Sequence, residues 1–136
     1  MNIEQLVSAH LERLIADPKG WLQLLADDAV VEFPYASSII RATSRLQGRA
    51  VIREYFAKAL ELFDGLTLSQ PTIHLTRDPE VAVVEVHGST IIKSTGKPYE
   101  QDYVMFIKSR AGRIVLYREY WNPLVAVSAC DMEVKS

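Results

Sequence analysis

The segment Leu116–Pro123, LYREYWNP, places one acidic side chain among aromatic ones. In an extended strand, alternate side chains point to opposite faces, so Tyr117, Glu119 and Trp121 share one face. A carboxylate between two aromatic rings is partly desolvated, and desolvation raises the pKa of a Glu above its reference of about 4.3. Such a group can accept and donate a proton near neutral pH. Glu119 is therefore a candidate catalytic acid or base, and an ion-paired Glu at a subunit contact is the structural alternative.

Polar groups on two other segments could complete such a site. Tyr55 shares the apolar face of a predicted helix with Phe56, where a core tyrosine with a hydrogen-bonded tip is the simplest interpretation. As a catalytic residue it would donate a hydrogen bond to a substrate oxygen. Gln101 shares a strand face with Tyr99 and Tyr103, and a buried amide is costly unless it is hydrogen-bonded. A pocket lining and a solvated face are both open interpretations of this strand.

We expect the candidate pocket to be formed mainly by aromatic side chains from several elements. Its predicted lining, beside Glu119 and Tyr55, comprises Tyr117, Trp121, Tyr103, Gln101, Phe33, Tyr35, His10 and Phe56. His10 lies on the apolar face of the first predicted helix, so a hydrogen-bonded core histidine is its simpler interpretation. We expect His74 to point away from the core and His87 to meet solvent or a second subunit.

Several other chemistries lack their sequence signals. The three histidines have no metal-ligand spacing, and neither HExxH nor CxxC occurs. No glycine-rich phosphate loop is present. Cys130, the only cysteine, lies in a predicted tail without a basic neighbour, so we do not expect a nucleophile there. The sequence predicts no metal site and no cofactor.

The elements that must position these residues follow from hydrophobic periodicity and turn signals. The first half predicts a helix over 3–16, a short helix over 18–26, a strand over 29–36 that Pro34 bends or ends, a loop over 37–47 and a long helix from Gly48 to Asp64-Gly65. The second half predicts a meander of strands over 66–77, 80–93, 98–109 and 113–122. Helices gathered before an antiparallel sheet indicate an α+β domain. We expect a curved antiparallel sheet wrapped around helices, which forms a cone with an internal pocket.

Three segments resemble a known family. GRAVIREYFAKALELF resembles its central helix, TRDPEVAVVEVHG a strand pair with the pattern T-x-DP…VE-x-x-G, and GRIVLYREYWNP a closing strand. The order of elements is similar to the nuclear-transport-factor/ketosteroid-isomerase-like fold over nearly the whole chain. Within that fold, the chain most resembles SnoaL-like proteins, especially the phenazine-biosynthesis proteins PhzA and PhzB.

This resemblance implies roles for two residues. In the phenazine proteins, the closing-strand Glu is an acid/base in a condensation of two amino-ketone molecules, and the matching residue here is Glu119. Their partner residue is a His on the central helix, where this chain has Tyr55. The phenazine reaction itself is therefore in doubt, while the pocket and its carboxylate are retained. A Tyr donor is known in ketosteroid-isomerase-like sites.

Composition limits the class of protein and its partners. The chain has 136 residues, of which 49% are hydrophobic, so we expect one domain over 1–136 with a proper core. The net charge of −2 and the lack of a basic stripe argue against nucleic acid. No apolar run reaches the roughly 20 residues of a membrane span, and no signal peptide is evident. We expect a cytoplasmic protein that does not bind membranes.

Two functions remain open from the sequence. One is a cofactor-free enzyme for isomerisation, cyclisation, dehydration or condensation at a carbonyl of a small organic ligand. The other is a non-catalytic module for ligand binding or dimerisation, and a second polar group facing Glu119 would favour the enzyme. Because the strand around Val81–Val86 is apolar on both faces, we also expect a homodimer in which a partner sheet covers the face without helices.

Overall fold

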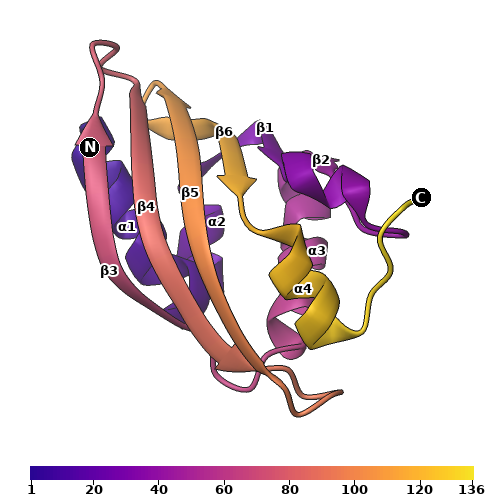
Figure 1. The fold of residues 1–136 in the computed structure, drawn as a ribbon. Coiled ribbons are helices and arrows are strands. Elements are labelled where there is room, and N and C mark those ends of the chain that lie inside the picture. The colour runs from indigo at the N-terminus through magenta and orange to yellow at the C-terminus, as the bar shows by residue number, and fades with distance from the viewer.

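A computed structural model describes residues 1–136 and shows an α+β fold with a curved, unclosed sheet (Figure 1). The helices are α1 (Ile3–Ala16), α2 (Pro18–Leu22), the 3-10 helix η1 (Pro34–Ser38), α3 (Arg49–Glu61) and α4 (Pro123–Cys130). The strands are β1 (Leu25–Glu32), β2 (Arg45–Gln47), β3 (Thr67–Leu75), β4 (Val81–Ile91), β5 (Pro98–Arg110) and β6 (Arg113–Tyr120). The predicted fold class is confirmed.

All six strands belong to one sheet with the order β2-β1-β6-β5-β4-β3. The predicted meander of β3 to β6 is confirmed, because each of these strands pairs antiparallel with the next. The pairing of β1 with β6 is parallel, so the sheet is mixed rather than purely antiparallel. This pairing sets β1 beside the strand that carries Glu119.

The predicted helix over 18–26 and the strand over 29–36 have different bounds in the structure. Helix α2 ends at Leu22, and β1 already begins at Leu25. Burial of Leu25, Ala29 and Val31 fixes β1 against the core, while Asp27 extends to an ion pair with Arg49 at 3.0 Å. The strand ends before Pro34, because this residue starts the 3-10 helix η1.

Two short elements occupy segments that were predicted to be irregular. Strand β2 lies within the predicted loop over 37–47 and pairs with the end of β1. Helix α4 lies in the predicted tail, where the side chain of Asn122 accepts from the backbone N–H of Leu124 and Pro123 occupies the first turn. A capping Asn followed by Pro is a typical helix start, so this signal was present in the sequence.

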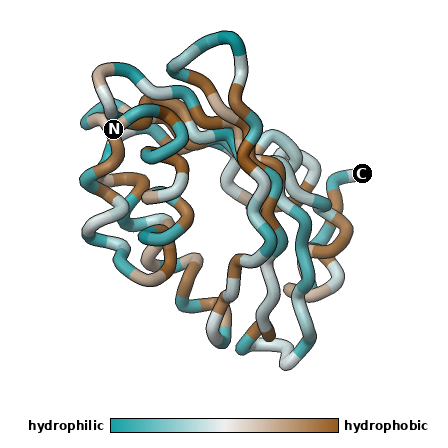
Figure 2. Tube along the Cα trace, turned by 90° about the vertical axis from the view of Figure 1, so that its left-hand side faces the viewer, coloured by the Kyte–Doolittle hydropathy of each residue, from teal (hydrophilic) through white to brown (hydrophobic).

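The helices pack on the concave face of the sheet. Helix α1 lies against β3 and β4, α3 against β1 and β2, and α4 against β5. In the side view of Figure 2, the helical turns that follow the N-terminus lie to the left of the strands, and the C-terminal segment lies to their right. None of the helices is both long and apolar enough to cross a membrane.

Strand β5 shows how the two faces differ. Tyr99, Gln101, Tyr103, Met105 and Ile107 are buried on the concave face, and the residues between them are exposed or half-buried. The strands were expected to have no clearly polar side. The outer face is in fact mixed, because charged residues stand between its apolar ones.

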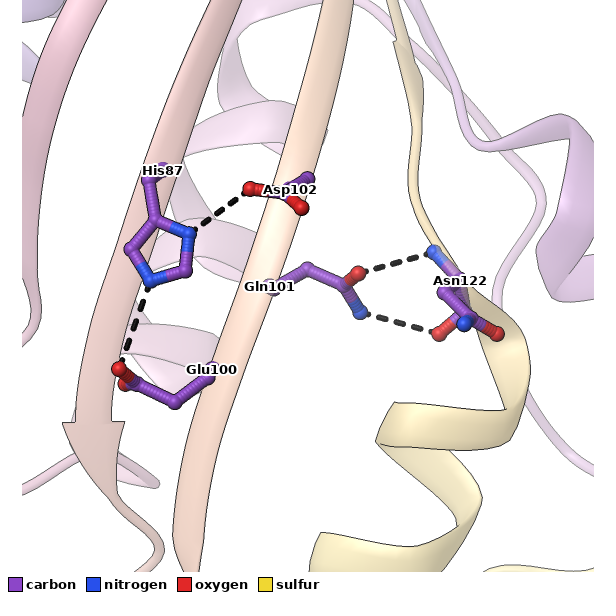
Figure 3. Close-up of polar contacts among 5 residues, drawn as sticks. All are labelled: His87, Glu100, Gln101, Asp102 and Asn122. Atoms are coloured by element: carbon purple, nitrogen blue, oxygen red, sulfur yellow. Dashed lines mark hydrogen bonds and ion pairs between the residues drawn. The ribbon is translucent and has the colours of Figure 1, made fainter.

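The histidines of the outer face contact carboxylates, His87 two of them and His74 one. His87 Nδ1 lies 2.8 Å from Asp102 Oδ1, and its Nε2 lies 3.4 Å from Glu100 Oε1 (Figure 3). The hydrogen bonds to Asp102 and Glu100 raise the pKa of His87. His74 Nε2 lies 2.7 Å from Glu85 Oε2. Both histidines therefore point away from the core, as predicted.

Candidate active site

A cavity of about 310 Å³ lies between the concave face of the sheet, helix α3 and the segment around η1 and α4. Of its 23 lining residues, 20 are hydrophobic, and the other three are Arg41, Thr43 and Glu119. Small-molecule sites have this character, with an apolar wall and a few placed polar groups. Glu119 is thus the only acidic residue of the cavity lining.

Strand alternation in β6 directs Glu119 into this cavity. Glu119 pairs with Met105 of β5, which is buried on the same face. Its neighbour Arg118 points to the outer face, where the guanidinium contacts Glu32 at 3.1 Å and lies over the ring of Phe106. The alternation predicted for this strand is therefore confirmed.

The environment of Glu119 disfavours its charge. Burial raises the pKa of Glu119 to about 7, and a hydrogen bond from the Tyr117 hydroxyl to Oε2 partly opposes this shift. The side chain is half-buried because the cavity leaves one side open, yet protein atoms surround the rest of the carboxylate. No cation forms an ion pair with it. The group can therefore exist in both protonation states near neutral pH.

Three tyrosines contribute hydroxyl groups to the wall of the cavity. Tyr55 comes from α3, and Tyr99 and Tyr103 come from β5. Burial, followed by the charge of Glu119, raises the pKa of Tyr55 to about 12 and also raises that of Tyr103. Burial is likewise the main cause that raises the pKa of Tyr99. These hydroxyls stay protonated at neutral pH and can donate hydrogen bonds to a ligand.

A buried amide stands behind the tyrosines. The backbone N–H of Asn122 donates to Gln101 Oε1 at 2.9 Å, and Gln101 Nε2 donates to the Asn122 carbonyl at 3.0 Å (Figure 3). Nε2 also donates to the Tyr99 hydroxyl at 3.2 Å. These three hydrogen bonds therefore offset the cost of burying the Gln101 amide, which the sequence analysis noted.

The cavity brings together most of the residues predicted for the site. Its lining includes Glu119, Tyr55, Trp121, Tyr103, Phe33 and Phe56. Tyr117 and Gln101 lie behind the lining, where they bond to Glu119 and to Tyr99. Tyr35 lies outside the cavity. It is exposed and packs against Tyr120 at 5.6 Å between ring centroids, because η1 turns the chain away after Phe33.

His10 is a core residue rather than part of the cavity lining. Trp21 Nε1 donates to His10 Nδ1 at 2.9 Å, so the proton of the neutral ring is on Nε2. Complete burial lowers the pKa of His10 to about 3. Its ring meets that of Tyr117 edge-on at 4.7 Å, and its Nε2 has no hydrogen-bond partner. His10 therefore supports Tyr117, which in turn bonds to Glu119.

Sequence reasoning missed the contributions of two segments to the site. Arg41 and Thr43 line the cavity from the segment predicted to be a loop. Ala126, Cys130 and Met132 line it from α4 and the residues after it. Only the capping signal at Asn122-Pro123 could have revealed α4, and nothing local indicated that it packs over the cavity. No group of three or more His, Cys, Asp and Glu side chains is arranged to hold a metal ion.

Comparisons with known proteins agree with this architecture. The family model of the SnoaL-like domain matches residues 7–117. An uncharacterized PhzA/B-like protein of Pseudomonas aeruginosa is 34% identical over 129 residues, which cover 91% of this chain and 86% of that protein. The uncharacterized protein YesE of Bacillus subtilis is 36% identical over 113 residues, covering 83% and 76% of the two chains.

Solved structures give the same result. A crystal structure from Bacillus subtilis, provisionally assigned as an isomerase, has a TM-score of 0.86 at 31% identity, covering 98% of this chain and 96% of that one. A phenazine biosynthesis-related protein of Pseudomonas aeruginosa has a TM-score of 0.82 at 18% identity, covering 98% and 83%. The second likeness shows the fold alone. With a family model that spans most of its length and relatives above 30% identity, this chain belongs to the SnoaL-like family.

Proposed function

We propose that this protein is a cofactor-independent enzyme that moves a proton at the carbon next to a carbonyl group of a small, largely apolar metabolite. The observation that carries this proposal is Glu119, a carboxylate in an apolar cavity without a cationic partner and with a pKa raised to about 7. A general base is most effective when its pKa lies near the working pH. The relative provisionally assigned as an isomerase accords with this class of reaction.

In the proposed step, the Glu119 carboxylate removes a proton from the α-carbon. The electron pair of the broken C–H bond moves into a new C=C bond, and the carbonyl oxygen gains the negative charge of an enolate. A tyrosine hydroxyl of the cavity wall donates a hydrogen bond to that oxygen, and such donors stabilise developing charge. Protonated Glu119 then returns the proton to the same carbon or to another one, so that the ligand is isomerised or prepared for ring closure.

A ligand-binding module without catalysis is the alternative. It would need the apolar cavity but not a hydroxyl donor facing Glu119. Burial is the main cause that raises the pKa of Tyr55, Tyr99 and Tyr103, and the charge of Glu119 in the same cavity raises it further. This pairing of a base with donors favours the enzyme.

The proposal can be tested with 2-tetralone, a bicyclic ketone with acidic protons next to its carbonyl. Proton NMR in D₂O follows the exchange of these protons for deuterium in the presence of the protein. We expect Glu119→Gln to slow the protein-dependent exchange by about 10²–10⁴-fold, the usual contribution of a general base. Glu100→Gln, on the outer face, is the matched control and should exchange like the wild type. A wild-type rate equal to that of buffer would contradict the enzyme and favour the binding module.

A further inference from the structure

The hydrogen bonds behind the cavity determine which tyrosine has a proton free for a ligand. We infer that Tyr99 is the residue that donates a hydrogen bond to the ligand oxygen, and that Gln101 is its positioning residue. This inference rests on the proposed function, because the oxygen concerned belongs to the carbonyl whose α-carbon Glu119 deprotonates. It assigns to Tyr99 the role that sequence analysis gave to Tyr55.

The orientation of the Gln101 amide is fixed by the backbone. Asn122 offers one N–H and one C=O to the same amide, at 2.9 Å and 3.0 Å. If the amide were flipped, the N–H of Asn122 would face an NH₂ group and its C=O would face an oxygen, so both bonds would be lost. Gln101 Nε2 must therefore be the atom that faces the Tyr99 hydroxyl at 3.2 Å.

The oxygen of Tyr99 accepts hydrogen bonds from two sides. Gln101 Nε2 donates from behind, and the Tyr103 hydroxyl donates from the same strand face at 3.4 Å. A phenol oxygen can accept two hydrogen bonds and donate one. No protein acceptor takes the remaining proton of Tyr99, and its side chain lines the cavity. The unused proton is therefore available to a ligand in that cavity.

The other tyrosines are less suited to this role. The proton of Tyr117 is committed to Glu119 Oε2, and the proton of Tyr103 is directed to Tyr99. Tyr55 lines the cavity, but its hydroxyl forms no hydrogen bond with the protein that would fix its direction. A donor that is already oriented loses less entropy when a ligand binds. Tyr99 is the only one of the four that is both free to donate and held in place.

Donors on the Tyr99 oxygen also strengthen it as an acid. The hydrogen bonds from Tyr103 and Gln101 lower the pKa of Tyr99 and so oppose the upward shift caused by burial. Consecutive hydrogen bonds polarise one another, so a hydroxyl that accepts two becomes a better donor. This matters most when charge develops on the ligand oxygen. The site therefore selects ligands that bear a carbonyl or another acceptor oxygen over hydrocarbons of the same shape.

Infrared spectroscopy of bound 2-tetralone, labelled with ¹³C at its carbonyl carbon, tests the inference directly. A hydrogen bond lowers the carbonyl stretching frequency, and tetralin is the matched ligand without an oxygen. We expect Tyr99→Phe to raise the stretching frequency and to weaken 2-tetralone binding by about 3- to 10-fold, the value of one neutral hydrogen bond. Tetralin affinity should not change. Gln101→Met should produce a partial shift of the same sign, because Tyr99 keeps its hydroxyl but loses its orientation.

Tyr55→Phe serves as the control and should retain the low frequency, whereas Tyr103→Phe removes one of the two donors to Tyr99 and should raise the frequency only partly. Loss of the low frequency in Tyr55→Phe, with Tyr99→Phe unchanged, would overturn the inference. Replacing Tyr99 by 3-fluorotyrosine keeps the shape of the side chain and makes the hydroxyl more acidic, so the frequency should fall further. Normal carbonyl shifts together with absent proton exchange would refute the proposed function and leave Tyr99 as the donor. Equal wild-type affinity for 2-tetralone and tetralin would refute the inference, while proton exchange decides the proposed function separately.

Discussion

The two faces of the sheet shift the pKa of a glutamate in opposite directions. Glu119 points from β6 into the cavity, where burial raises its pKa to about 7. Glu100 points outward from the adjacent strand β5, where hydrogen bonds from Ser89 and His87 lower its pKa. Both residues have the same side chain and lie in neighbouring strands. The difference shows that loss of water and absence of a cation, not the residue type, create the candidate base.

The largest expected difference between the two faces is in how the free energy of unfolding depends on pH. The pKa of Glu119 is about 7 in the folded protein against about 4.5 when unfolded, so the folded state binds more protons between these values. Wild-type stability should therefore fall as pH rises from about 4.5 to 7, by on the order of 2–3 kcal/mol. Glu119→Gln should lack this loss and become the more stable protein at neutral pH. Urea unfolding of both proteins across this range measures the difference.

Glu100→Gln provides the control with the opposite sign. Its lowered pKa means that the wild-type carboxylate adds stability above the unfolded pKa and loses it as pH falls. If the free energies of unfolding of the wild type and Glu119→Gln changed equally with pH, the described difference between the two faces would be refuted.

A smaller effect comes from the packing behind Tyr103. A Cβ added at Gly88 would lie 2.7 Å from Cε2 of Tyr103, on the concave face of β4. We expect Gly88→Ala to displace this ring, to reduce the free energy of unfolding by about 1–3 kcal/mol and to weaken 2-tetralone binding. Ser89→Ala, the next residue on the outer face, should change stability by less than about 0.5 kcal/mol. Similar losses in both variants would contradict the contrast between the faces.

The smallest expected change in folding stability concerns the outer face itself. We propose that this face pairs with a second copy of the chain, because Val104 is 38% exposed there beside the half-buried Phe106 and Val83. Val104→Lys should leave the folded protomer within about 0.5 kcal/mol of the wild type but convert a dimer to a monomer in sedimentation velocity. Val51→Lys, at an exposed apolar position of α3, should remain dimeric. A wild type that sediments as a monomer at micromolar concentration would refute the pairing.

Local signals predicted most of the fold. The periodicity of α1 and α3 and the alternation within β3 to β6 depend only on nearby residues, so these elements could be recognised. The parallel pairing of β1 with β6 could not, because it joins segments far apart in the chain and has no local signature. The strand predicted over 29–36 does end before Pro34, as the sequence indicated, but the 3-10 helix that begins at this residue was not predicted.

In the candidate site, too, local signals predicted some features and could not predict others. Strand alternation was sufficient to direct Glu119 toward the concave face. The role of Gln101 could not be predicted, because its partner Asn122 lies 21 residues away in the chain. Asn122 is also held at the start of α4, a helix in a segment that was predicted to be a tail. The orientation of Tyr99 depends on that amide and was hidden for the same reason.

The position of α4 determines at which stage of folding the cavity can form. All pairings of the six-stranded sheet involve residues up to Tyr120. The cavity wall, however, includes Ala126, Cys130 and Met132, and the donor chain through Gln101 needs Asn122. A chain that has formed only its sheet therefore lacks the complete site. The cavity and its oriented donor arise when α4 packs against β5.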